Sequence, residues 1–177
     1  PENMLIWRRS AKRLEAEIIR DTILATSGTL DTTQFGKGTL DERSAKRSIY
    51  FTVKRSRLIP LLKLFDAPDA MQGIATREQS TVAPQALALL NSPLIREYAT
   101  KFATRVRPNT EISNEQVITA TYEIALSRPA TATEIQTMNQ FITSQTEMRG
   151  GDANAQQLAV RDFCHLVLCM NEFIYID

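Results

Sequence analysis

The sequence has 177 residues, of which 43% are hydrophobic and 23% are charged. These values are ordinary for a globular domain and exclude extensive disorder. A chain of this length can bury a sizeable core without disulfide bonds, and it fits one domain or one domain with a small subdomain. Because no apolar run approaches the length of a membrane span and no basic-then-apolar leader is visible, we expect no membrane-spanning segment in this sequence.

The net charge is only +1, but the charges are unevenly distributed. Residues 1–63 carry 13 Lys and Arg against 7 Asp and Glu, whereas residues 64–177 carry 8 against 13. The basic first third could contact an acidic partner domain, an anionic polymer or nucleic acid. A simpler interpretation is that the two parts neutralise each other or solvate the surface. Nucleic acid is the least favoured partner, because no dense Lys/Arg run with interleaved aromatic residues is present.

The order of apolar residues predicts a helical protein whose first third is partly extended. A helical stripe predicts a first helix over Ser10–Ser27, with Gly28 as its C-terminal cap residue. Residues 29–47 lack periodicity and predict a long loop. The β-branched and aromatic run Ser48–Val53 is the best strand candidate. Leu58–Phe65 predicts a short apolar helix, with a proline in its first turn where proline is tolerated.

The rest of the sequence predicts a run of amphipathic helices. Met71–Gln79 is expected to be irregular, and Thr81 is expected to cap the helix that follows. The last helix is strongly apolar, so we expect it near the centre of the fold. The predicted helices, in chain order, are Ala83–Leu90, Pro93 to about Val106, a helix capped by Ser113 that runs through Leu126, a helix from Thr131 or Thr133 to about Met148, and Ala153–Asn171.

Together these elements predict a mainly α fold. We expect an irregular multi-helix bundle with a long N-terminal loop and at most one short extended segment. It forms a single domain over residues 1–177, in which a basic subregion with a helix and an extended loop (1–70) precedes the helical bundle (71–177).

The segment Arg77–Asn91 changes from polar to apolar and is the first candidate for a functional site. Helix N-termini favour anions, and the planar guanidinium of Arg77 suits a carboxylate or a phosphate. Gln85, in the first turn of the predicted helix, and the basic residues Arg55 and Arg57 are candidates to contact the same ligand. The alternative is structural: a neighbouring hydroxyl caps the helix, Arg77 pairs with an internal carboxylate, and Gln85 satisfies a buried loop.

No catalytic or metal-binding set stands out. Cys164, His165 and Cys169 lie on one predicted helix, but no second histidine exists to complete a zinc site, and the haem attachment pattern Cys-x-x-Cys-His is absent. His165 lies among apolar residues, which disfavours a Ser–His–Asp site. Asp66 and Asp69 could act as an acid–base pair on a glycan, but their run is more typical of a turn. We therefore predict no catalytic residue, no metal site and no cofactor in this domain.

Four stretches of the sequence resemble one protein family in their order and spacing. The most distinctive is Ser80–Asn91, and the others are Lys12–Asp21, Ala125–Pro129 and Leu168–Asp177. They are similar to the planctomycete-specific C-terminal domain, a domain of unknown function (DUF1553), over nearly the whole chain. One departure lies at Gly73–Glu78, where the family often has a cysteine and a doubled arginine. This sequence has one arginine and no cysteine there, so no role that needs that thiol or a second guanidinium transfers to it.

The resemblance implies a context rather than a reaction. Such domains usually end large exported proteins of Planctomycetes and related bacteria. They follow a second uncharacterised domain, and often a cytochrome c-like domain nearer the N-terminus. The resemblance therefore implies an extracytoplasmic location, in the periplasm or at the cell surface, and upstream domains of the same polypeptide as partners. The family offers no catalytic residues that transfer to this sequence.

Two hypotheses follow for the function. In the first, the domain is a non-catalytic interaction or scaffold module that packs its basic third against a neighbouring domain. In the second, it binds or processes an anionic polysaccharide, with Arg77, Gln85, Arg55 and Arg57 in contact with the ligand. The two differ in whether Arg77 is held in an internal ion pair or is open to a pocket.

Overall fold

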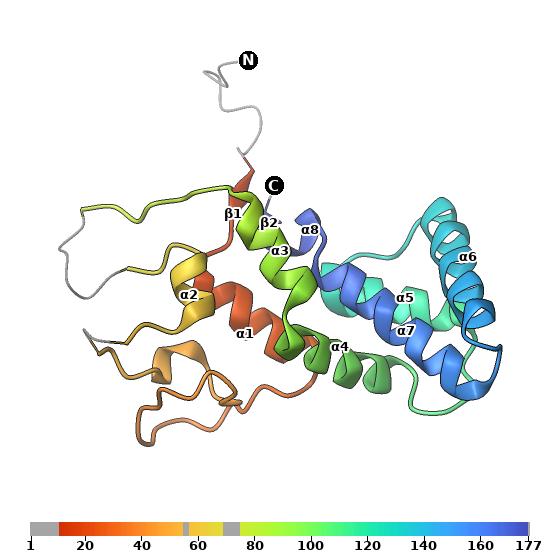
Figure 1. Cartoon of the computed structure of the whole chain (residues 1–177), viewed down its shortest axis with the longest axis horizontal. Helices are drawn as coiled ribbons and strands as arrows, with labels where there is room; N and C mark the ends of the chain where they lie inside the picture. The colour runs from red at the N-terminus through yellow and green to blue at the C-terminus, as the bar shows by residue number, and fades with distance from the viewer. Residues whose placement is uncertain (1–10, 55–56, 69–74, 177) are drawn as a thin grey trace, which may run out of the picture.

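The computed structural model describes residues 11–54, 57–68 and 75–176 and shows a mainly α-helical protein, as predicted (Figure 1). No helix in these ranges is long and apolar enough to cross a membrane. The described elements, in chain order, are β1 (Lys12–Arg13), α1 (Ala16–Thr26), the 3-10 helix η1 (Ser48–Tyr50), α2 (Pro60–Leu64), α3 (Ala83–Asn91), α4 (Pro93–Val106), α5 (Asn114–Leu126), α6 (Ala132–Met148), α7 (Ala153–Leu168), α8 (Asn171–Ile174) and β2 (Tyr175–Ile176).

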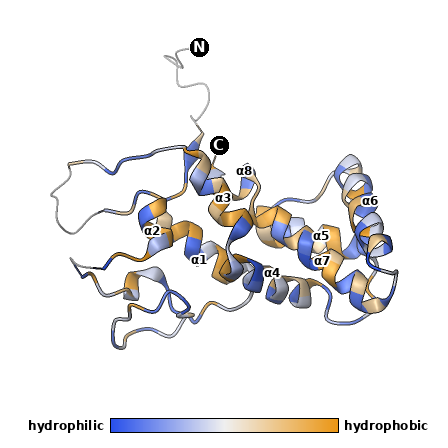
Figure 2. Cartoon of the chain, in the orientation of Figure 1, coloured by the Kyte–Doolittle hydropathy of each residue, from blue (hydrophilic) through white to orange (hydrophobic). Residues whose placement is uncertain are grey.

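The core of the bundle is built around α7, which packs against α4, α5 and α6. The prediction that the last long helix lies near the centre is therefore confirmed, and Figure 2 shows hydrophobic residues concentrated where α5 and α7 lie. Phe163 and Val167 of α7 are fully buried. The apolar spacing of α4 also places its residues as predicted. Its buried face includes Ile95, Tyr98, Ala99, Phe102 and Val106.

Three of the predicted helices are shorter than expected. The short apolar helix predicted over Leu58–Phe65 spans only Pro60–Leu64, and the other two are shortened because the ends of the fold pair with each other. The first helix begins at Ala16, because the two residues of β1 pair antiparallel with the two residues of β2 (Ser10 lies outside the described residues). The last long helix ends at Leu168 rather than at Asn171, and α8 then turns the chain into β2. A pattern local to one segment carries no information about a partner at the opposite end of the sequence.

The long loop after α1 is fixed by Arg20, a residue of α1 that is only 3% exposed. Its guanidinium lies over the ring of Phe51, 4.5 Å from the ring centroid. The acceptors of its hydrogen bonds are the carbonyls of Glu42 (3.3 Å), Ser44 and Lys46 (2.9 Å) and the hydroxyl of Ser48 (3.2 Å). Because a guanidinium carries five donors in one rigid fork, a single side chain orders much of a loop that has no periodic structure.

The predicted strand at Ser48–Val53 is wrong, because Ser48–Tyr50 form η1 instead. Asp21, next to Arg20 on α1, fixes the start of this turn: its Oδ1 accepts hydrogen bonds from the backbone N–H and the hydroxyl of Ser48, both 2.7 Å long. Phe51 then continues in an extended conformation and forms an isolated bridge with Thr39. The run is therefore held to α1 through Ser48, which is buried, and leaves Ile49 and Val53 exposed rather than forming a strand of a sheet.

The cap residues are predicted correctly at two helices and wrongly at a third. The hydroxyls of Ser113 and Thr131 each accept a hydrogen bond of 3.3 Å from the backbone N–H three residues later, at the starts of α5 and α6. Thr81 does not cap α3. The N-cap residue is Val82, and Thr81 Oγ1 lies 3.1 Å from the hydroxyl of Tyr175 on β2. The hydroxyl thus ties the start of α3 to the terminal sheet.

If Arg20 orders the loop, replacing it should destabilise the protein and expose the loop. We expect Arg20→Leu to lower the free energy of unfolding by about 3 kcal/mol, because the carbonyls of the loop lose their buried donor. Urea denaturation measures this loss, and limited proteolysis should show new cleavage within residues 29–47. The matched control is Arg43→Leu in the same loop, where the arginine is 64% exposed and the expected cost is below about 1 kcal/mol. Equal losses in the two variants would contradict this role of Arg20.

Candidate functional site

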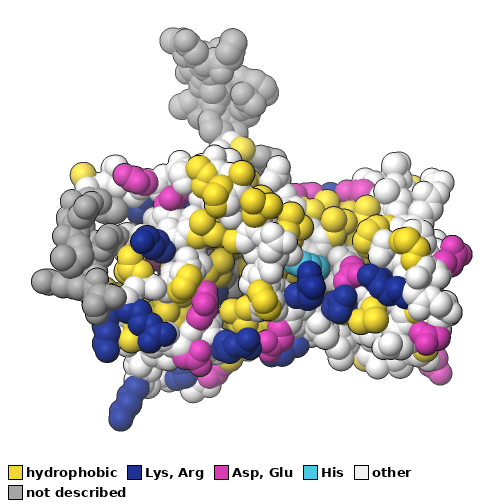
Figure 3. Space-filling view, viewed as in Figure 1, with side chains coloured by type: hydrophobic (Ala, Val, Ile, Leu, Met, Phe, Trp, Pro, Cys, Tyr) yellow, Lys and Arg dark blue, Asp and Glu magenta, His cyan; other side chains and the backbone are white. Residues whose placement is uncertain are grey.

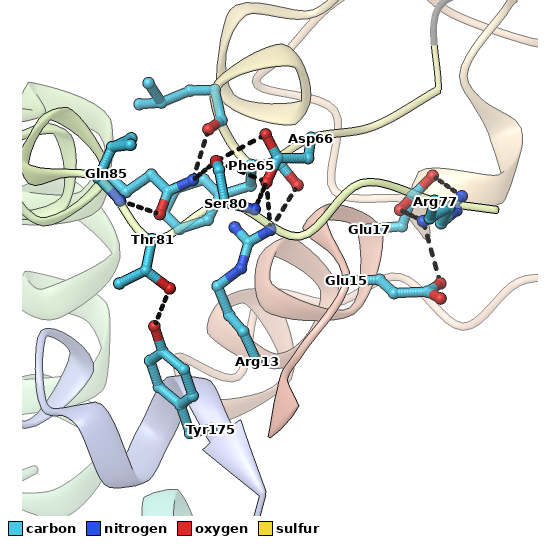
Figure 4. Close-up of polar contacts among 12 residues, drawn as sticks. Arg13, Glu15, Glu17, Phe65, Asp66, Arg77, Ser80, Thr81, Gln85 and Tyr175 are labelled. Atoms are coloured by element: carbon cyan, nitrogen blue, oxygen red, sulfur yellow. Dashed lines mark hydrogen bonds and ion pairs between the residues drawn. The ribbon is translucent and has the colours of Figure 1, made fainter. Parts of the chain in front are cut away.

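A buried polar junction joins four segments of the chain where α3 begins (Figure 4). We define it by Arg13 of β1, Asp66 after α2, Ser80 before α3, and Gln85 of α3. Asp66 Oδ2 accepts hydrogen bonds from Arg13 Nη2 and from the backbone N–H of Ser80, both 2.7 Å long. The Ser80 hydroxyl donates to the same carboxylate, and Gln85 Nε2 donates to the Ser80 oxygen over 3.1 Å. The distinctive motif at Ser80–Asn91 is therefore anchored to β1 and α2 through buried (Arg13, Gln85) and partly buried (Asp66, Ser80) side chains.

Asp66 remains ionised inside this junction. Burial alone would raise its pKa, but the hydrogen bonds from Ser80 and the charge and hydrogen bond of Arg13 together hold the pKa below its ordinary value of 3.8. Asp66 lies in a turn with a φ of +61°, a left-handed conformation that aspartate tolerates better than most residues. The turn predicted for this run is therefore present at Asp66, whereas Asp69 lies outside the described residues.

Gln85 is only 5% exposed, and both ends of its amide are engaged. Besides the bond to Ser80, its Nε2 donates to the carbonyl of Leu64 over 3.0 Å. Its Oε1 accepts from the backbone N–H of Val82 over 3.3 Å, which satisfies a donor at the start of α3. Gln85 therefore satisfies a buried loop, as the structural interpretation of this segment predicted.

Arg77 forms an ion pair with α1. Its Nη1 and Nη2 donate to the two carboxylate oxygens of Glu17, both over 2.8 Å, and Nη1 also donates to Glu15 over 3.0 Å. This bidentate contact lowers the pKa of Glu17, and the hydrogen bonds that Arg77 donates to Glu17 raise the pKa of Arg77. The side chain of Arg77 is still 31% exposed. Arg77 is thus paired internally, but its outer surface faces solvent.

A hollow of about 430 Å³ lies beside this ion pair, between α1, η1 and α2. Arg77 and Arg57 both line it, whereas Gln85 does not, and Arg55 lies outside the described residues. The structure therefore brings together two of the four predicted ligand-binding residues. The other charged residues that line the hollow are Glu15, Glu17, Asp21, Arg47, Lys54 and Lys63, and the exposed apolar ones are Ile18, Ile49 and Val53.

The thiols and the imidazole are used for packing in the described structure. Burial raises the pKa of the Cys164 thiol well above its usual range and that of Cys169 to about 11, so both are poor nucleophiles. His165 Nε2 lies 2.9 Å from the carbonyl of Leu89, and because a carbonyl only accepts, Nε2 carries the proton. Across residues 11–54, 57–68 and 75–176, no group of three His, Cys, Asp or Glu side chains could hold a metal ion.

The fold and its contacts thus define a helical module in which the motif segment is braced by ion pairs between arginine and carboxylate side chains, one of them with a buried arginine. A family model described as PSD1, protein of unknown function (DUF1553), matches residues 1–142. The chain therefore belongs to this family of unknown function. No curated protein and no solved structure matches the chain.

The side chains that organise the site were mostly not singled out by their residue type. Arg13, Arg20 and Ser80 lie within the stretches Lys12–Asp21 and Ser80–Asn91 that carry the family resemblance, but single charged residues beside apolar ones look like surface positions. One signal in the sequence could have identified Arg20. It lies four residues after Ala16 and four before Leu24, on the face of α1 that is otherwise apolar and buried. A charged residue at such a position is retained only when it has internal partners.

The junction and the Arg77 ion pair should differ in their effect on stability. Asp66→Asn leaves the buried Arg13 without its counter-charge, so we expect a loss of about 3 kcal/mol in the free energy of unfolding. Arg77→Ala breaks a partly exposed pair and should cost about 1 kcal/mol or less. Urea denaturation at pH 7 compares the two variants.

The same carboxylate predicts a pH dependence. Because folding lowers the pKa of Asp66 from its ordinary 3.8, its stabilisation is present above that value and is lost as the pH falls through the lowered pKa. The free energy of unfolding of the wild type should therefore fall more steeply below about pH 4 than that of Asp66→Asn. Parallel pH profiles of the two proteins would show that Asp66 does not have this role.

Proposed function

We propose that this domain is a non-catalytic interaction module that docks a neighbouring domain of the same polypeptide on the exposed face of α3. The observation that carries the proposal is the apolar character of this face. Val82, Leu87 and Leu90 are 46%, 53% and 46% exposed, and Ala83 and Ala86 are exposed between them. Figure 3 shows hydrophobic side chains gathered where α3 lies in Figure 1. Contiguous apolar patches of this kind are typical of protein–protein interfaces.

The opposite face of α3 is packed against the rest of the domain, so the exposed face can bind a partner without rearranging. Gln85 and Leu89, on the opposite face, are buried and hold the helix to the junction and to α7. No residue of α3 carries a charge, so no charged group needs to be desolvated when a partner covers it. A surface that is ordered before binding loses little entropy on association.

The position of α3 also favours, as the partner, a domain that precedes this one in the polypeptide. Thr81, just before α3, contacts Tyr175 of β2, and β2 pairs with β1. A domain joined ahead of β1 would therefore be tethered beside the α3 face, and tethering raises its effective concentration there. In the context that the family resemblance implies, that neighbour is a second uncharacterised domain. We extend the proposal to an extracytoplasmic location, an association with a cytochrome c-like domain, and a function without a cofactor in this domain.

The α3 face can be tested by introducing charge at its exposed positions. The double variant Leu87→Glu/Leu90→Glu should bind the separately produced upstream part of the polypeptide at least about tenfold more weakly than the wild type, because a carboxylate must be desolvated at each position. Both residues are exposed, so the fold should be retained, and circular dichroism checks this. Biolayer interferometry measures the affinity.

The matched control for the double variant is Met148→Glu at the end of α6, where the side chain is 70% exposed. Its affinity for the upstream part should equal that of the wild type. Equal binding by the double variant and the wild type would argue against α3 as the docking face.

Binding of an anionic polysaccharide is the second candidate function. The observation that favours it is that Arg57 and Arg77 line one hollow together with the exposed Lys54 and Lys63. A saturable interaction with a sulfated oligosaccharide, weakened by salt and by Arg57→Glu, is the result expected from this function. Absence of binding across a panel of sulfated glycans would remove it.

A further inference from the structure

We infer that the hollow between α1, η1 and α2 binds an extended acidic peptide segment of a partner protein, with one bulky apolar side chain of that segment inserted into it. This goes beyond the docking of a neighbouring domain on α3, because the hollow is lined by none of the residues of α3. Its volume of about 430 Å³ lies within the range of sites that hold small ligands or single anchoring side chains.

The apolar residues of the hollow provide the anchoring surface. Ile59 is buried, and Leu58, Leu62 and Phe51 are partly buried along its lining. At its margin Ile49 and Val53 are 77% and 78% exposed, although both are large and β-branched. Leaving two such side chains in water is unfavourable, and an apolar partner side chain that covers them would remove this cost.

The charges of the hollow are not balanced within the described structure. Glu15 and Glu17 are both paired with Arg77. Asp21 accepts two hydrogen bonds from Ser48 and is 3.5 Å from Arg47.

Three further basic side chains, Lys54, Arg57 and Lys63, are exposed and have no ion-pair partner among the described residues. Glu15 and Glu17 share the single positive charge of Arg77, but the lining as a whole holds five basic side chains against three carboxylates, so the net charge of the hollow is positive. A negatively charged ligand matches this charge.

A peptide fits this combination better than a glycan. In an extended chain every second side chain points to the same side, so an apolar residue can enter the hollow while acidic residues two positions away reach Lys54 and Arg57. A sulfated glycan would satisfy the same bases but would place sulfates and hydroxyls against Ile49 and Val53. The exposed apolar rim is what distinguishes the two ligands.

Two sides of the hollow are held in place before binding. Arg20 and Asp21 hold the segment that carries Ile49, and the bidentate pair between Arg77 and Glu17 closes the side next to α1. Asp21 and Glu17 lie one turn apart on α1, so both walls are set by the same helix. Preorganisation of this kind favours a defined peptide conformation over a diffuse charge attraction.

Fluorescence anisotropy with the full chain tests the inference. The probe is a labelled peptide in which a tryptophan–leucine pair is flanked by glutamates. It should bind saturably, and Arg57→Glu and Ile49→Asp should each weaken binding by about tenfold or more. Val53→Asp is a second variant of the apolar rim. Replacing the glutamates of the probe by glutamines, or its apolar pair by glycines, should weaken binding comparably.

The controls are matched in charge and exposure. Arg96→Glu on α4 changes the net charge as Arg57→Glu does, and Met148→Asp places a carboxylate at an equally exposed apolar residue. Both should bind the probe as the wild type does, and so should Leu87→Glu/Leu90→Glu, which separates this site from the α3 face.

Two results would overturn the inference. The first is no saturable peptide binding, or binding that neither Arg57→Glu nor Ile49→Asp weakens. The second is binding of a sulfated oligosaccharide that depends on Arg57 but not on Ile49, because the ligand would then be a glycan recognised by charge alone.

Discussion

The first third of this protein depends on one buried guanidinium. Residues 29–47 have no helical or strand periodicity, and a loop of that length normally has too few contacts to be ordered. Arg20 supplies the contacts from the side of α1, with donors to several carbonyls and a stacked aromatic ring. Burying the charge of Arg20 costs free energy, so the arrangement is stable only when the loop supplies all of the acceptors for its guanidinium. Loss of Arg20 would therefore disorder the loop, η1 and the adjoining side of the hollow at the same time.

Arginine side chains also join distant segments at two other places, where they pair with carboxylates and differ in exposure. Arg13 is buried with Asp66 and fixes the start of α3, whereas Arg77 is partly exposed and joins the segment before α3 to α1. Both proposed interaction surfaces rest on these pairs. The α3 face is oriented by the junction, and the hollow is bounded by Arg77 and Glu17. These arginine–carboxylate pairs thus hold the two surfaces in position.

The helical bundle could be predicted from sequence because its information is local. The apolar spacing of α4 and the cap residues Ser113 and Thr131 are read within a few turns of chain. The first third could not be predicted in the same way. Its strand candidate became a 3-10 turn because Asp21 bonds to Ser48, and the role of Arg77 depends on carboxylates sixty residues away. Side-chain pairs between distant segments leave no periodic signal.

The antiparallel pairing of β1 with β2 has a mechanical consequence. Lys12 lies opposite Ile176 and Arg13 opposite Tyr175. A force that pulls Lys12 away from Ile176 would therefore break the first of these pairs before it loads the second. The ladder would yield at low force while the bundle around α7 remains intact. Tyr175 belongs to the second pair and also contacts Thr81, so opening that pair would release one of the contacts that hold the start of α3. Tension on the polypeptide would thus reach the α3 face before it reaches the core.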